Sequence, residues 1–189
     1  KTTYAMNVDG YLLEMEDYIA DNLIEKKEYT YKNGIIRQLK TFDSNGKEIS
    51  NRDFIINDQN QIEKTIVSSL NGERTIKYQY EGNSKLPDSG NELDKNGKKI
   101  RSWKLAYKNN LVSIHRNYTA DGKMTSQTFY TYNLNNDLVE LIEKDGNNKI
   151  SHRQSSEYQR DEHQNWIEKK VYDENKVLIS TSIRKIKYW

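Results

Sequence analysis

Apolar and polar residues alternate along most of this chain, and the alternation predicts β-strands. From residue 102 to residue 107, Trp103, Leu105 and Tyr107 fall on one side of such a strand, while Lys104 falls on the other. Residues 124–132 repeat the layout. A period of two places successive side chains on opposite faces of a strand. Because this pattern recurs almost throughout, the sequence predicts an all-β protein.

A Tyr-x-Tyr pair, or a similar pair of residues, ends one strand in each of a series of repeats. Tyr78 and Tyr80 form one such pair, and Tyr130 and Tyr132 form another. The last residues of the pairs are Tyr4, Tyr31, Ile56, Tyr80, Tyr107, Tyr132, Tyr158 and Tyr188. Neighbouring members of this series are 24 to 30 residues apart. The chain is therefore an array of units of about 25 residues.

Tight-turn dipeptides recur between the Tyr-x-Tyr pairs with the same spacing. They are Asn45-Gly46, Asn71-Gly72, Asn96-Gly97, Asp121-Gly122 and Asp145-Gly146. Both residues of such dipeptides tolerate positive φ, which the type I′ turn of a two-residue hairpin requires. A looser, Asn-rich turn follows each Tyr-x-Tyr pair. Each repeat is thus predicted to be one β-hairpin, and the chain an antiparallel meander of about 15 strands.

An apolar residue stands after most of the looser turns. These residues are Leu12, Ile35, Ile62, Leu111, Leu138 and Ile167. In a meander they are expected to lie across from the Tyr-x-Tyr pairs on neighbouring strands, where aromatic and branched side chains stabilise a sheet.

Residues 11–27 allow two interpretations. Helical spacing is present among four apolar side chains, namely Leu12, Met15, Ile19 and Leu23. The phase of the repeats instead predicts a hairpin that turns at Asp21-Asn22. The hairpin is the favoured alternative, and the helix stays open at this point.

The stretch 83–94 also departs from the repeat. It contains Pro87, the only proline of the chain. Proline cannot donate a hydrogen bond to a β-ladder, so this stretch is predicted to be an irregular strand or a loop. We interpret it as an irregular insertion within a single β-hairpin repeat domain that covers residues 1–189.

The composition predicts a sheet without a thick core. Hydrophobic residues make up 34% of the chain, whereas about 45–50% is usual in soluble globular domains. The 14 tyrosines suit half-exposed, pleated surfaces. We expect so long a sheet to accumulate twist and curl into an open barrel, shell or spiral. Its edges are predicted at residues 1–7 and 177–189, where Lys176, Lys185 and Lys187 would discourage pairing with other chains.

Charge and cysteine content narrow the class of function. The net charge is only +2, without a one-signed basic stretch, so nucleic acid is not an expected partner. No apolar run reaches the roughly 18 residues of a membrane-spanning helix. The absence of cysteine excludes disulfides and thiolate zinc sites. The chain begins at Lys1, which fits an exported protein whose signal has been removed or trimmed.

The repeat pattern resembles bacterial YD-repeat (RHS-like) proteins. Residues 161–172 are similar to the Asp-x-x-Gly-Asn-Trp segment of that family and its following strand. Two features depart from the family: Gln164 replaces the expected glycine, and Tyr-Asp occurs only at Tyr172-Asp173. The resemblance implies a small, divergent, exported member. It supplies no catalytic residues, and at this length the role of the large members as shells around toxin cargo does not apply.

Candidate site residues are few. His115, His152 and His163 lack the spacing of a metal site, and no turn carries the spaced carboxylates of a calcium loop, so no metal or cofactor is predicted. Trp103, Trp166 and Tyr172 are weak candidates for binding a sugar or peptide. The alternative for these aromatic residues is packing along one face of the sheet.

These observations favour a non-enzymatic structural or interaction module of the bacterial cell envelope, periplasmic or at the cell surface. Its expected partner is an unidentified protein or glycan. The alternative is a carbohydrate- or peptide-binding protein that uses a concave Tyr/Trp-rich face. A glycan-acting hydrolase is the third possibility, and it would need two carboxyl groups about 5–9.5 Å apart in a pocket.

Overall fold

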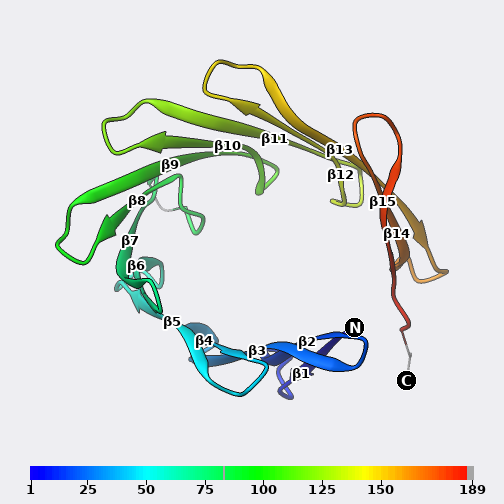
Figure 1. The fold of residues 1–189 in the computed structure, drawn as a ribbon, viewed down its shortest axis with the longest axis horizontal. Coiled ribbons are helices and arrows are strands. Elements are labelled where there is room, and N and C mark those ends of the chain that lie inside the picture. Colours follow the sequence, from blue (N-terminus) through cyan, green and yellow to red (C-terminus); the bar gives the residue numbers. More distant parts are fainter. Residues whose placement is uncertain (83, 187–189) are drawn as a thin grey trace. The chain divides into compact units, whose positions relative to one another are not determined.

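Fifteen β-strands make up all the regular structure in the residues that the computed structural model describes, 1–82 and 84–186 (Figure 1). They form one sheet whose strand order follows the chain. The strands are β1(Thr2–Met6), β2(Leu12–Ile19), β3(Asn22–Lys32), β4(Ile35–Asp43), β5(Glu48–Ile56), β6(Ile62–Ser69), β7(Gly72–Gln79), β8(Ser89–Asp94), β9(Lys99–Lys108), β10(Leu111–Thr119), β11(Met124–Tyr132), β12(Leu138–Asp145), β13(Ile150–Arg160), β14(Trp166–Tyr172) and β15(Leu178–Ile183). The predicted antiparallel meander is confirmed.

Contacts group the chain into two compact units, a first unit Lys1–Arg101 and a second unit Ser102–Trp189. Figure 1 shows that the strands of each unit form a single layer and that the strand direction changes from one hairpin to the next. The predicted curling is therefore present within each unit.

Residues 11–27 form a hairpin, as the favoured interpretation predicted. β2 and β3 pair antiparallel, with Ile19 opposite Asn22. The turn lies at Ala20-Asp21, one residue earlier than expected, and both residues have positive φ, 47° and 64°. This is the backbone of a type I′ turn, which matches the twist of the flanking strands.

The predicted turn type is wrong for the Asn-Gly series. At Asn45-Gly46 only the glycine has positive φ, 76°. The Gly46 amide donates to the Asp43 carbonyl oxygen, so the turn begins two residues before the Asn-Gly dipeptide. Positive φ at both central residues occurs instead at Asn33-Gly34 and Asn109-Asn110, in the looser turn class. The hairpins are where the sequence predicts them, but turn geometry does not follow the two predicted classes. Ala20-Asp21, in the phase of the tight turns, has positive φ at both residues, whereas the looser turns that begin at Asn57 and Asn133 resemble the Asp43 turn.

A shared side-chain contact holds eight of the turns in residues 1–82 and 84–186. In each, an Asp or Asn oxygen accepts hydrogen bonds from the backbone amides two and four residues later, as Asp43 does from Asn45 (2.9 Å) and Lys47 (3.0 Å). The accepting residues are Asn7, Asp43, Asn57, Asp94, Asn133, Asp145, Asp161 and Asp173. The residue three positions after each has positive φ. That residue is Gly or Asn in six of the eight turns, and it is Gln164 or Lys176 in the other two. The usual sequence signal is thus Asp/Asn followed three residues later by Gly or Asn.

Gln164 occupies the positive-φ position of one such turn, with φ 62°. Side chains other than those of Gly, Asn and Asp are strained there by about 1 kcal/mol. Replacing Gln164 by glycine is therefore expected to raise the free energy of unfolding by roughly 0.5–1 kcal/mol, measured by urea denaturation. As a control, Glu162→Gly changes an exposed residue of the same turn that lacks positive φ, and it should lower stability. Equal effects of the two substitutions would contradict the strain argument.

The core is thin and mostly polar. Among the described residues, Val67, at 3% exposure, is the one buried hydrophobic side chain, and the buried polar residues are Thr41, Gln61, Thr65, Ser89, Glu92 and Thr128. The chain exposes 13063 Å², whereas a compact protein of its mass would expose about 9,400 Å². The single layer explains both facts, because neither face is covered by a second sheet or helix within its unit.

A β-bulge recurs near one end of the hairpins. In ten of the twelve strand pairs whose register the structure describes, the register shifts by one residue. Between β11 and β12, for example, Thr131 lies opposite Glu140 and Tyr132 opposite Leu138, so Val139 is unpaired. Bulges increase the local right-handed twist of a strand pair. Their repetition accounts for the bending of the sheet within each unit.

The residues that face the Tyr-x-Tyr pairs on neighbouring strands test the predicted cross-strand contacts. The predicted apolar partners are confirmed where Tyr132 faces Leu138 and Ile56 faces Ile62. The prediction is wrong for three others. Ile35 faces Lys32, and Leu12 faces Met6. Ile167 is the bulge residue, because Trp166 faces Arg160.

The hydroxyl of the second tyrosine also donates to a backbone carbonyl near the start of the preceding strand. Such bonds join Tyr132 to Val112, Tyr158 to Leu138 and Tyr80 to Ile62. The last tyrosine of the series, Tyr188, lies outside the described residues.

The proline-containing stretch divides into a loop and a regular strand. Residues 84–88 lie in the loop after β7, and β8 then pairs with β7 in regular register. Gln61 Nε2 donates to the Ser84 carbonyl oxygen at 2.6 Å, and Lys85 Nζ donates to the Gln59 carbonyl oxygen at 2.9 Å. These bonds fasten the loop to the turn between β5 and β6. Asn83 lies outside the described residues.

Candidate binding surface

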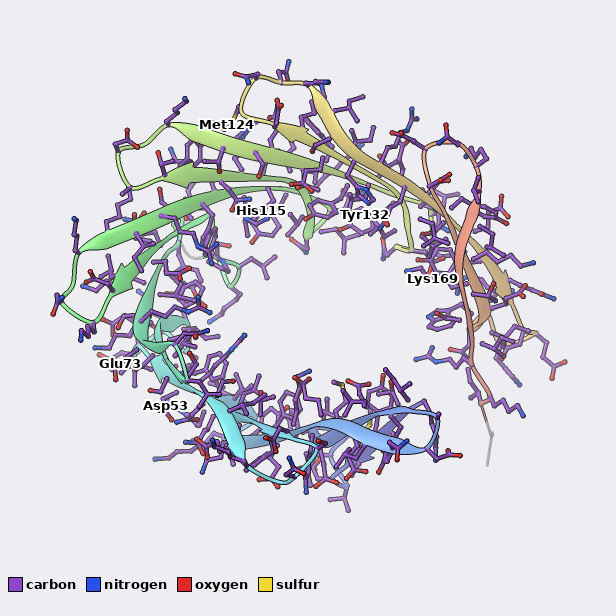
Figure 2. All side chains as sticks on the ribbon, in the orientation of Figure 1. Asp53, Glu73, His115, Met124, Tyr132 and Lys169 are labelled. Carbon is purple, nitrogen blue, oxygen red and sulfur yellow. The ribbon has the colours of Figure 1, made fainter. Side chains whose placement is uncertain are left out.

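The strand register gives the second unit two chemically different faces. Tyr130, Leu141 and Gln154 lie opposite one another on β11, β12 and β13, so they share one face. We call it the tyrosine face. The neighbouring residues Phe129 and Ile142 lie on the other face. Figure 2 shows side chains on both sides of the layer, with His115, Tyr132 and Lys169 on the tyrosine face.

A groove of about 600 Å³ crosses the tyrosine face between two turns. Its lining includes Asn109, Leu111, Tyr130, Tyr132, Leu134 and Asn136. We call it the tyrosine groove. The strands β10 and β11 form its floor, and the turns β9–β10 and β11–β12 form its sides.

Backbone geometry explains why asparagines line the sides of this groove. Asn109 and Asn136 have φ values of 53° and 63°. Asparagine is, after glycine, the residue that adopts positive φ most readily. Asn133 accepts the amides of Asn135 and Asp137 through Oδ1, which closes the second turn. The turns therefore place amide side chains beside the tyrosines for a structural reason.

The two tyrosines of the groove have different roles. The Tyr132 hydroxyl donates to the Val112 carbonyl oxygen at 3.1 Å, and burial raises the pKa of Tyr132. Tyr132 is thus part of the framework. The Tyr130 hydroxyl makes no hydrogen bond within the described part of the chain, so it is available to a ligand.

The groove offers stacking surfaces and neutral hydrogen-bonding groups. Lys108 is the one charged residue in its lining, and the remaining groups are amides, hydroxyls, aromatic rings and leucines. Leu134 is fully exposed at the rim. Binding sites for small molecules combine an apolar or aromatic surface with a few polar groups that orient the ligand. The lining is suited to a neutral, hydroxyl-rich or peptide-like ligand.

The three aromatic residues predicted from the sequence do not form one site. Trp103 lies edge-to-face with His115 at 6.3 Å between ring centroids, on the tyrosine face. Trp166 lies edge-to-face with Tyr158 at 6.4 Å, and the Arg184 guanidinium lies 4.6 Å from its ring centroid.

Tyr172 lies on the opposite face, opposite Ser155. Its hydroxyl donates to Glu157 Oε2 at 3.0 Å, and this hydrogen bond is the main reason that the pKa of Tyr172 is raised. The candidates thus contact separate neighbours, and the sequence analysis missed the tyrosine groove. A signal for it was present in the Asn-rich turns that flank the pair Tyr130–Tyr132.

Burial beside Trp103 lowers the pKa of His115. The unfolded chain, with a histidine pKa near 6.5, then binds more protons than the folded chain below that pH. The stability associated with neutral His115 is complete above about pH 6.5 and is lost as the pH falls towards the lowered pKa of the folded state. We expect the urea midpoint to fall between pH 7 and pH 5, and His115→Gln to reduce this fall. His163→Gln, in an exposed turn, serves as the control, and equal pH profiles for the two variants would contradict the prediction.

Charged clusters elsewhere are paired internally. In the first unit, Glu92 is buried, with Oε1 3.0 Å from Arg74 Nη1 and Oε2 2.7 Å from Arg101 Nε. In the second unit, burial of Asp137 opposes its charge, but hydrogen bonds from Arg160 and Asn133 outweigh it and lower the pKa of Asp137. Among the described residues, no three His, Asp or Glu side chains gather as a metal site would require.

The comparisons with known proteins show similarity of fold. No model of a known protein family matches the sequence, and no curated protein matches it. The structure is similar to that of a porin-like protein from Bacteroides uniformis, with a TM-score of 0.59 and 14% identity over 97% of this chain and 89% of that one. A porin-like protein from Bacteroides vulgatus also matches, with a TM-score of 0.46 and 13% identity over 98% of both chains.

A complex described as TcdB2-TccC3 matches with a TM-score of 0.39 and 12% identity. The match covers 96% of this chain but only 10% of that one. At 14% identity, the similarity to the Bacteroides uniformis protein is one of fold alone. In the part of the chain that the structure describes, no helix has the length and apolar character needed to cross a membrane.

Proposed function

We propose that this chain is a non-enzymatic structural or interaction module of the bacterial cell envelope, exported to the periplasm or the cell surface. The observation that carries the proposal is the single-layer hairpin array, in which no second sheet or helix covers either face of a unit among the described residues. Repeat proteins of this kind present extended surfaces to large partners. The similarity of fold to the porin-like protein of Bacteroides uniformis supports an envelope location.

We further propose that the chain is a small, divergent relative of the YD-repeat proteins. Its support is the recurrence of Tyr-x-Tyr pairs and Asp/Asn turns. Both features supply side chains that form hydrogen bonds with the backbone. The second tyrosine of three pairs donates to the preceding strand, and the first residue of eight turns accepts two amides. Gln164 adopts positive φ, the conformation that suits the glycine expected at its position.

Fractionation of cells that produce the native protein tests the location. We expect the protein in the periplasmic or surface-exposed fraction and, after chemical crosslinking of intact cells, in complexes with envelope components. A purely cytoplasmic distribution would contradict the proposal. Turnover of a panel of glycoside or ester substrates by the purified chain would contradict its non-enzymatic part.

A second candidate function is carbohydrate or peptide binding on the tyrosine face, and the tyrosine groove favours it. Aromatic rings stack on the apolar faces of sugars, and amides pair with hydroxyl groups. Tyr130 has a free hydroxyl in the described chain and lies between the two Asn-bearing turns. Nothing in this argument requires catalysis, because the lining holds no carboxylate.

A glycan array followed by calorimetry tests this second function. A neutral oligosaccharide that binds the chain should lose about two- to tenfold in affinity with Tyr130→Ala, since aromatic stacking contributes about 0.5–1.5 kcal/mol. Phe129→Ala is the matched control, because it removes a neighbouring ring from the opposite face of the same strand. Equal losses for both variants, or an array without binding, would leave the groove without this role.

A further inference from the structure

Strand β15 ends the strand order, and it pairs with β14 alone among the described residues. All six of its residues are exposed, including Ile179 at 55% and Ile183 at 74%. Natural edge strands are usually protected by charge, proline or a covering segment. The lysines expected to protect this edge lie outside the strand: Lys176 is in the preceding turn, Lys185 follows the strand, and Lys187 is outside the described residues.

The sequence of this edge is a palindrome. Residues 179–183 read Ile-Ser-Thr-Ser-Ile in both directions. Two copies of such a strand can pair antiparallel across a twofold axis that passes through Thr181. Thr181 then faces Thr181 of the second copy, each Ser180 faces a Ser182, and each Ile179 faces an Ile183. Hydroxyl pairs and β-branched apolar pairs of this kind stabilise neighbouring strands, and no like charges oppose each other.

This pairing also preserves the faces of the sheet. Ser180 and Ser182 lie opposite Val171 and Lys169, on the tyrosine face. Thr181 lies opposite Lys170, on the other face. An axis at Thr181 joins even-numbered residues to even-numbered residues and odd to odd. The tyrosine face of one copy therefore continues into the tyrosine face of the other.

We propose that β15 is a self-association edge, and that its partner is a second copy of this chain in an antiparallel, twofold-symmetric pair. The contact is short, since six residues bury far less than the roughly 1,200 Å² of a stable interface. Association is therefore weak and depends on concentration, with a dissociation constant of about 10–1,000 µM.

Crosslinking through one introduced cysteine tests the register. The chain has no cysteine of its own, so Thr181→Cys supplies a single thiol. Directly opposed residues of antiparallel strands have Cα atoms about 4.5–5.5 Å apart, within the range of a disulfide. At about 100 µM protein, in the middle of that range of dissociation constants, we expect mild oxidation to give a disulfide-linked dimer. Ile19→Cys, at an exposed residue of another hairpin, should give much less.

Sedimentation equilibrium tests the association itself. The average mass of the unmodified chain should rise from 22.4 kDa towards twice that value as the concentration increases. Thr181→Lys places two ammonium groups face to face at the axis and should weaken dimerisation at least about tenfold. Ile19→Lys is the control and should associate like the unmodified chain. Circular dichroism confirms that each variant folds.

Three results would overturn the proposal. The first is a constant monomer mass up to about 1 mM, the upper limit of the expected range, without crosslinking of Thr181→Cys. The second is association of Thr181→Lys equal to that of the unmodified chain. The third is growth beyond the dimer, which would indicate head-to-tail pairing of β15 with another edge.

Discussion

Replacing Glu92 by glutamine is expected to lower the free energy of unfolding by about 2 kcal/mol. The carboxylate is only 7% exposed, and its two oxygens accept from Arg74 and Arg101. Hydrogen bonds to charged groups contribute about 1.5–3 kcal/mol, and breaking a fully buried ion pair costs about 3–5 kcal/mol. The expected loss is smaller here because the arginines, 43% and 57% exposed, regain water when the charge is removed. Urea denaturation measures the loss.

Two further variants make this prediction specific. Glu73→Gln removes an exposed carboxylate from a neighbouring strand of the same unit and should change stability by less than about 0.5 kcal/mol. The double variant Arg74→Met with Glu92→Leu replaces the pair by apolar side chains and should recover part of the loss. A loss for Glu73→Gln as large as that for Glu92→Gln would show that burial of the carboxylate is not the cause.

Replacing Gly146 by alanine is expected to cost about 2 kcal/mol, the usual penalty for forcing extra atoms into a packed site. The reason is a close backbone contact rather than positive φ. A Cβ atom at Gly146 would lie 2.6 Å from the Met124 carbonyl oxygen and 3.5 Å from that of Thr125. The backbone of β11 must shift to admit a methyl group. Thermal or urea denaturation gives the change in stability.

Gly46 provides the matched comparison, because its surroundings are open and its φ is 76°. Gly46→Ala should cost about 1 kcal/mol through backbone strain, and Gly46→Asn should recover part of that cost. Gly146→Asn, by contrast, should be no better than Gly146→Ala, since any Cβ meets the same carbonyl oxygen. Rescue of Gly146 by asparagine would contradict the contact argument.

The sequence predicts which residue types could form the candidate site, but not which of them lie together and remain accessible. The sequence shows Tyr130, Tyr132 and the asparagines of the flanking turns, but it equally shows Trp103, Trp166 and Tyr172. Packing decided between them: Trp103 lies against His115, Trp166 lies between Tyr158 and Arg184, and Tyr172 lies on the opposite face. Two turns that are 23 residues apart at Asn110 and Asn133 flank one groove. A single sequence does not reveal which side chains such neighbours leave accessible.

The hairpin order follows from local chemistry alone. A period of two defines each strand, and short turn residues that tolerate positive φ end it, so a meander of about fifteen strands could be predicted, with alternatives left open at residues 11–27 and 83–94. The recurrence near 25 residues needs no long-range information, because every strand pairs with its neighbours in the sequence.

Only the tertiary structure decided the turn geometry, the bulges and the burial of individual side chains. Whether Asn45-Gly46 or Asn33-Gly34 adopts positive φ at both residues depends on the register of the strands that they join. The unpaired residue of each bulge, such as Val139, is set by how neighbouring strands twist against each other. Glu92 is charged like its exposed neighbours in the sequence, and it is buried because two arginines from other strands converge on it. These properties arise from interactions between strands, which the alternation of residues within one strand does not encode.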